Sequence, residues 1–121
     1  SIDFPLLRYA DILLLRAEAL NEINGPNQES IDLINEVRGV AGITDLDLTG
    51  QTQQSIRDAI IQERAWEFHT EGLRRQDLIR QGRFISDAVA RGWNAKDYQV
   101  LFPIPQVEID ANPNLEQNDG Y

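Results

Sequence analysis

The sequence has no cysteine and no methionine, and basic residues are few. Without cysteine there is neither a disulfide framework nor a thiolate metal site, and redox chemistry gives no clue to the compartment. Without methionine, Ser1 is not expected to be a natural translation start. The 11 basic residues stand against 20 acidic ones, so the net charge is -9. Because that charge repels phosphate backbones, we expect no nucleic-acid partner.

Long apolar runs are also missing. The longest unbroken one covers residues 12–15, far below the roughly 18 residues that span a bilayer. At 121 residues the chain is one domain or part of one, which is long enough for a modest core. We therefore expect the visible chain to be soluble.

Apolar residues at helical spacing predict an all-α fold that opens with an antiparallel helical hairpin over residues 5–42. Its first helix should begin at Pro5 and end at Gly25, and Asn27 should cap the second. Two apolar stripes predict a largely enclosed first helix: Leu6, Ala10, Leu13, Ala17 and Leu20, and Ile12, Leu15, Ala19 and Ile23. In size the hairpin resembles one tetratricopeptide unit that would complete a repeat array, and an ordinary helical hairpin is the open alternative.

A polar loop over residues 43–51 leads to central helices over residues 52–91, with Thr52 as the N-cap. Two apolar lines, one of them through Trp66, predict a long helix that is covered on more than one side. Gly72 lies inside this helical pattern, where it would mark a kink, a break or the close approach of another backbone, and we expect one long helix with a bend there. A short helix should follow over residues 84–91.

Residues 92–121 change in character. Turn signals and Pro103-Ile104-Pro105 predict an extended, proline-rich tail with at most one helical turn around residues 107–110. The tail contains too many apolar residues to be disordered, so we expect it to pack on the helices.

Charged residues fill the spaces between the apolar lines of the central helices. Glu71 with Arg75, Arg64 with Glu67 and Asp77 with Arg80 are spaced to pair within one helix. We assign this set, called the charge lattice, the structural role of joining the helices to the tail: Glu63, Arg64, Glu67, Glu71, Arg74, Asp77 and Arg80.

Three motifs, in order along the chain, make it similar to a known family. The first begins at Arg8-Tyr9-Ala10-Asp11. The second runs from Glu63-Arg64 to Gly82, and the third runs from Leu101-Phe102-Pro103 to Asn118. In these stretches the sequence resembles the C-terminal region of the SusD/RagB family, the glycan-capturing lipoproteins of the Bacteroidetes outer membrane. The family usually ends in Asn-Pro-Gly-Tyr, where this chain has Asn118-Asp119-Gly120-Tyr121.

The resemblance implies a non-catalytic protein at the outer membrane and cell surface, lipid-anchored through an N-terminal part upstream of Ser1. It implies capture of an oligosaccharide and delivery to a TonB-dependent, SusC-like transporter. It carries over no sugar-contacting residue by position, because these residues vary between members of the family.

The spacing of the glutamates and of the histidine argues against a catalytic or metal site. Glu63, Glu67 and Glu71 share one helical line, whereas glycoside hydrolysis needs two carboxyl groups that face each other across a cleft. His69, the only histidine, lacks the Glu-x-x-His spacing of carboxylate-bridged metal sites. We expect no enzyme activity, no cofactor and no metal.

Aromatic side chains are the remaining candidates for ligand binding, because sugars lay their apolar faces on aromatic rings. Trp93 and Tyr98 lie in a turn-rich segment beside polar residues and are the candidate glycan contacts. The simpler interpretation is that both rings anchor the tail. The alternative function is that of a tetratricopeptide-like adaptor that binds a protein and no sugar.

Overall fold

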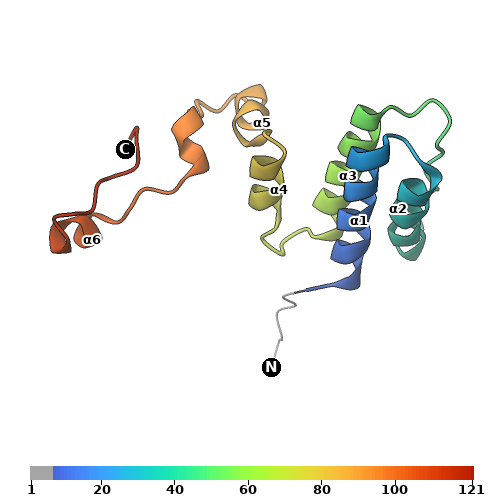
Figure 1. The fold of residues 1–121 in the computed structure, drawn as a ribbon, viewed down its shortest axis with the longest axis horizontal. Coiled ribbons are helices and arrows are strands. Elements are labelled where there is room, and N and C mark those ends of the chain that lie inside the picture. Colours follow the sequence, from blue (N-terminus) through green and yellow to red (C-terminus); the bar gives the residue numbers. More distant parts are fainter. Residues whose placement is uncertain (1–6) are drawn as a thin grey trace. The chain divides into compact units, whose positions relative to one another are not determined.

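The computed structural model describes residues 7–121. The elements in this range are all helical (Figure 1): α1 (Tyr9–Asn24), α2 (Gln28–Val40), α3 (Gln53–Glu67), α4 (Arg74–Arg80), α5 (Phe84–Ala90), the 3-10 helix η1 (Asp97–Val100) and α6 (Gln106–Ala111). The all-α class is therefore confirmed. The chain forms two compact units, one that extends to Arg74 and one that covers Arg75–Tyr121.

In the first unit α1 packs on both α2 and α3 and lies between them (Figure 1). The predicted hairpin is confirmed, and its turn follows from local chemistry. Gly25 has a φ of 70° and donates its N–H to the carbonyl of Asn21, which closes α1. The side chain of Asn27 accepts the N–H of Ser30 at 2.9 Å and so caps α2, as expected.

One face of each helix supplies the core of this unit. Its fully enclosed members come from all three helices: Leu14, Ala17, Ile31, Ile34, Ile56 and Ile60. Burial of these side chains is the main stabilising term, at roughly 1.5–3 kcal/mol for each large aliphatic residue.

The prediction that α1 is largely enclosed was wrong. Its second stripe is open: Ile12 and Leu15 are exposed, and the side chain of Ile23 is 78% exposed. Among the described elements α1 packs on α2 and α3, and its buried residues, Leu13, Leu14, Ala17, Glu18 and Asn21, do not include this second stripe. The helix begins at Tyr9, and the start expected at Pro5 lies outside the described residues. Trp66, placed in the core by its spacing, is also exposed at the end of α3.

The predicted interruption near Gly72 is present, and it is a break between two helices. α3 ends at Glu67 and α4 begins at Arg74. Between them Thr70 has a φ of 72° and Gly72 a φ of 81°, values that cannot continue a right-handed helix. The long bent helix predicted here is therefore two separate elements.

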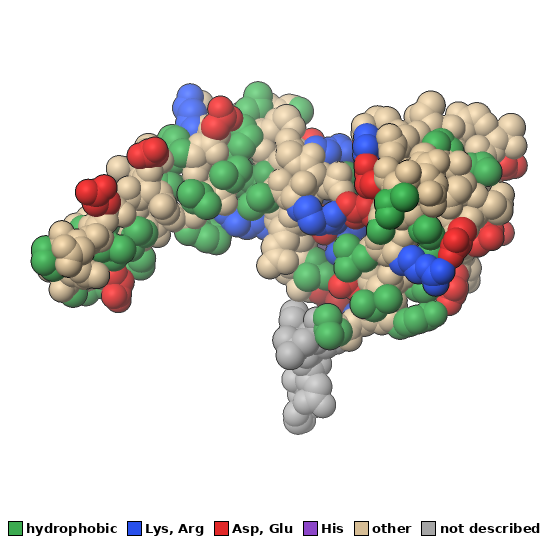
Figure 2. Space-filling model, viewed as in Figure 1, with side chains coloured by type: hydrophobic (Ala, Val, Ile, Leu, Met, Phe, Trp, Pro, Cys, Tyr) green, Lys and Arg blue, Asp and Glu red, His purple; other side chains and the backbone are tan. Residues whose placement is uncertain are grey.

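In the second unit the tail folds back on itself around α6. The side-chain amide of Gln117 bonds both the N–H and the carbonyl of Ile104, at 2.8 and 2.9 Å. The amide of Asn118 donates to the carbonyl of Phe102, and the hydroxyl of Tyr121 donates to that of Leu101, each at 2.8 Å. The two extended arms are thus joined by side-chain hydrogen bonds to the backbone. Figure 2 shows hydrophobic side chains over the surface of this unit, where Leu101, Phe102 and Val107 are among the exposed residues.

Candidate ligand pocket and charge lattice

The charge lattice joins residues that are far apart in the sequence. Arg8, just before α1, pairs with Glu67 and, at 2.8 Å, with Glu71. The hydrogen bond with Glu67 is the main reason why the pKa of Arg8 is raised above its ordinary value. Arg64 pairs with Asp11 at 2.6 Å. These contacts fasten the end of α3 to the start of α1.

A second group of lattice contacts ties α3 to its other neighbours. Glu63 pairs with Arg38 of α2 at 3.0 Å, and the Arg38 guanidinium also donates to the carbonyl of Thr44 in the following loop. Arg74 donates to the carbonyl of Ile61 at 3.0 Å. Each link crosses from one element to another, and none of these contacts reaches the tail, to which the lattice was expected to join the helices.

Phe68 lies among the lattice cations. The guanidinium carbons of Arg8 and Arg64 are 5.4 and 5.0 Å from the centre of its ring, and the ring itself is buried. Such cation–π contacts are each worth about 0.5–2 kcal/mol, more when water is excluded. The ring therefore holds both arginines in the positions in which they meet their carboxylates.

The pairings differ from those that helical spacing predicts. Asp77 and Arg80 pair at 3.3 Å, as expected. Glu71 instead binds Arg8, because residues 68–73 are not helical and the i+4 geometry with Arg75 does not exist. Arg8, Asp11 and Arg38 were missed as lattice members, since sequence spacing carries no information on pairs more than 20 residues apart.

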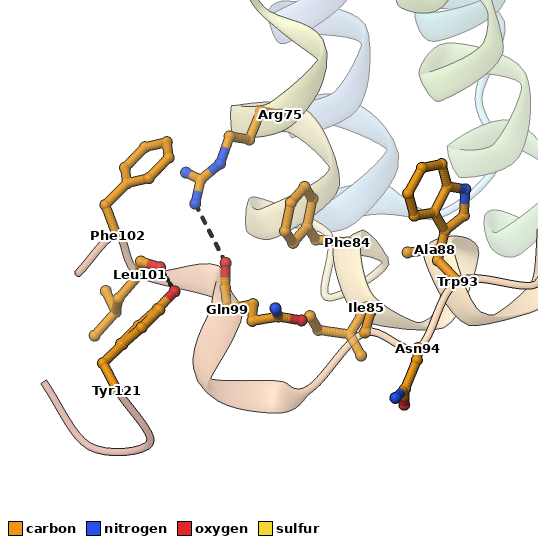
Figure 3. A pocket seen from close by; sticks show the side chains of 11 residues that line it. Arg75, Phe84, Ile85, Ala88, Trp93, Asn94, Gln99, Leu101, Phe102 and Tyr121 are labelled. Atoms are coloured by element: carbon orange, nitrogen blue, oxygen red, sulfur yellow. Dashed lines mark hydrogen bonds between the residues drawn. The ribbon is translucent and has the colours of Figure 1, made fainter.

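A pocket lies within the second unit and is seen from close by in Figure 3. Its volume is about 370 Å³, in the range of small-molecule sites. The lining is largely apolar with a few polar groups: Arg75, Phe84, Ile85, Ala88, Trp93, Asn94, Ala95, Gln99, Leu101, Phe102 and Tyr121. Such a surface suits a ligand with both an apolar face and hydrogen-bonding groups.

Arg75 is the only charged side chain in this lining. Its guanidinium points between two rings (Figure 3), 4.1 Å from the centre of Phe102 and 5.0 Å from that of Phe84. Its Nη2 donates to the carbonyl of Val100 at 2.8 Å and, more weakly, to that of Gln99 at 3.5 Å. The side chain is thus fixed by contacts with α5 and the tail.

The two candidate glycan contacts lie in different surroundings. Trp93 lines the pocket and is 71% exposed, so its ring is open to a ligand. Tyr98 is not part of the lining; it meets Tyr121 edge to face with ring centres 4.9 Å apart. Gly120 has a φ of 93°, and a Cβ there would lie 2.5 Å from the Tyr98 ring. Tyr98 therefore packs against Tyr121 and Gly120, whereas Trp93 lines the pocket.

The helices in the described range include none that is long and apolar enough to cross a membrane. Residues 1–121 match the model of the SusD family. The chain belongs to this family. It is 41% identical over 124 residues to SusD-like protein P25 of Formosa agariphila, which covers 95% of this chain and 23% of that protein. It is 35% identical over 127 residues to the starch-binding protein SusD of Bacteroides thetaiotaomicron, covering 98% of this chain and 22% of the relative.

Solved structures of the SusD family share the fold. A SusD superfamily protein from Bacteroides vulgatus superposes with a TM-score of 0.81 at 30% identity, over 95% of this chain and 27% of that one. A SusD homolog from Bacteroides thetaiotaomicron superposes with a TM-score of 0.77 at 38% identity, over 96% and 26% of the two chains. The chain thus spans about a quarter of the length of these SusD relatives.

Proposed function

We propose that the natural protein containing this chain is a non-catalytic glycan-binding component of the outer membrane. It captures oligosaccharides at the cell surface and passes them to a TonB-dependent, SusC-like transporter. The observation that carries the proposal is the family match over the whole chain, together with 35% identity to a protein named for starch binding.

The local chemistry supports binding in preference to catalysis. Each of Glu63, Glu67 and Glu71 is engaged by an arginine of the lattice, so this line of carboxylates serves the fold. The pocket of the second unit offers aromatic rings and hydrogen-bonding groups, which is the equipment for holding a sugar.

Affinity electrophoresis tests the proposal. The full-length protein is run through native gels that contain plant, host or microbial polysaccharides, beside a reference protein that binds none of them. Slower migration in at least one glycan gel is expected. No retardation across the panel would refute glycan capture and would favour the adaptor function.

The same gels, run with the 121-residue chain, locate the binding site. If only the full-length protein is slowed, the main site lies outside this chain. If the chain is slowed as well, Trp93→Ala and Tyr98→Ala decide between the two aromatic candidates. We expect Trp93→Ala to weaken binding more, because Trp93 is the ring that lines the pocket.

A further inference from the structure

Arg75, in the pocket, differs from the arginines that form the long-range ion pairs of the charge lattice. Arg8, Arg38 and Arg64 each pair with a carboxylate. Arg75 pairs with no acidic side chain among residues 7–121; its hydrogen bonds go from Nη2 to backbone carbonyl oxygens. Arg75 is half-buried, so its positive charge on a largely apolar pocket wall is available to an anionic ligand.

The geometry also prepares this charge for a ligand. Stacking by Phe84 and Phe102 and the bond to the carbonyl of Val100 hold the guanidinium in place. The protein therefore loses little side-chain entropy when the charge is used. Nη1 and Nε make no hydrogen bond within the described residues, so each remains as a single donor on its own edge of the guanidinium. A carboxylate oxygen accepts such a donor in a charge-assisted hydrogen bond, which is roughly twice as strong as a neutral one.

The remaining lining narrows the class of ligand. Trp93, at 71% exposed, offers an open ring on which the apolar face of a pyranose can stack. Asn94 and Gln99 supply amide groups for hydroxyls. The cavity volume of about 370 Å³ lies at the lower end of the range for ligand sites. The pocket therefore suits one or two sugar residues.

We propose that this pocket is a subsite for an acidic glycan, in which a uronate carboxylate binds Arg75 on one side of Phe84 and a sugar ring of the same glycan stacks on Trp93 on the other (Figure 3). The inference rests on the proposed glycan-binding function and adds to it the chemical class of one bound residue. A neutral sugar needs no charge at this position, so the subsite discriminates between acidic and neutral glycans.

The test uses the full-length protein in affinity gels that contain uronate-bearing polysaccharides, each beside its carboxyl-reduced form and beside a neutral panel. Carboxyl reduction converts each uronate carboxylate to a primary alcohol and leaves the glycosidic linkages of the polysaccharide intact. We expect binding to at least one acidic polysaccharide and weaker binding to its reduced form. Arg75→Gln should weaken binding of the acidic form about tenfold or more, because a hydrogen bond to a charged group is lost.

Arg91→Gln is the matched control. It removes the same charge from an exposed position at the end of α5, outside the pocket lining, and it should bind like wild type. Melting temperature shows whether Arg75→Gln folds. If that variant does not fold, Trp93→Ala decides, because removing an exposed ring disturbs the core little; it should also lose about tenfold in affinity.

The possible outcomes separate the two proposals. Equal binding of the acidic and reduced forms, binding of neutral glycans alone, or wild-type affinity in folded Arg75→Gln would overturn the acidic subsite and leave glycan capture standing. If Arg75→Gln is unfolded, wild-type affinity in Trp93→Ala would overturn the acidic subsite and leave glycan capture standing. No retardation by any polysaccharide would end both proposals.

Discussion

The ion pair between Glu63 and Arg38 gives the sharpest test of the structural role of the charge lattice. The Glu63 side chain is 3% exposed and that of Arg38 17%, with 3.0 Å between Nη1 and Oε2. Glu63→Leu keeps a similar volume and leaves Arg38 without its carboxylate. Breaking a buried pair by removing one partner costs about 3–5 kcal/mol. Because Arg38 keeps some water and its bonds to the carbonyl of Thr44, we expect about 2–3 kcal/mol here.

A double-mutant cycle isolates the pair. Arg38→Met alone leaves a buried carboxylate, and the double variant leaves neither charge, so its cost should fall below the sum of the single costs by at least about 1 kcal/mol. The measurement is the free energy of unfolding of the full-length protein in urea, with circular dichroism as the signal.

Glu29→Leu is the control for this cycle. Glu29 pairs with Arg16 at the surface of the same unit, where both side chains are more than half exposed. Exposed pairs of this kind contribute about 0–1 kcal/mol, so its loss should barely change stability. A Glu63→Leu variant as stable as the Glu29→Leu variant, or additive single effects, would refute the structural role of this pair.

Three further predictions concern stability. Arg74→Ala should lower the melting temperature through about 1 kcal/mol lost with its bond to the Ile61 carbonyl, with glycan specificity unchanged in affinity gels; a variant that melts like wild type yet loses binding would contradict this. Arg57 lowers the pKa of Glu22 below its ordinary value of 4.5, so the pair stabilises above that pH and its contribution disappears as the pH falls through the lowered pKa. Glu22→Gln should thus lower the free energy of unfolding in urea by under about 1 kcal/mol at pH 7, because Glu22 is over a third exposed. In strong acid it should not change this free energy. Equal costs at both pH values would contradict the assignment. Gly120→Ala should destabilise the second unit by about 1–3 kcal/mol, because of its positive φ and the nearby Tyr98 ring; unchanged amide exchange in the tail would argue against it.

Local features of this fold could be predicted from the sequence because their causes are local. Asn27 and Thr52 cap α2 and α3 by accepting the N–H of a residue three positions on, so the residue type and its place before an apolar pattern are enough. The hairpin followed in the same way from Gly25 and from the inward residues of α2. The exposed side of α1 could not be predicted, because an apolar stripe does not show how many neighbours the structure supplies.

The break after α3 was only half predictable. Gly72 indicated an interruption, but the apolar pattern continues through Phe68 and Leu73 and favoured one long helix. Nothing in the sequence marks Thr70 for its φ of 72°, since a β-branched residue rarely adopts that conformation.

This break also explains why the sequence did not single out Arg75 as a pocket residue. On a continuous helix Arg75 would lie one turn after Glu71, and the two charges would neutralise each other. With residues 68–73 out of helical conformation, Glu71 binds Arg8, while Arg75 lies between Phe84 and Phe102. Because this turn is irregular, Glu71 pairs with Arg8 in the charge lattice and Arg75 lines the pocket. A substitution that restored the helix through this turn should weaken the lattice and neutralise the subsite together.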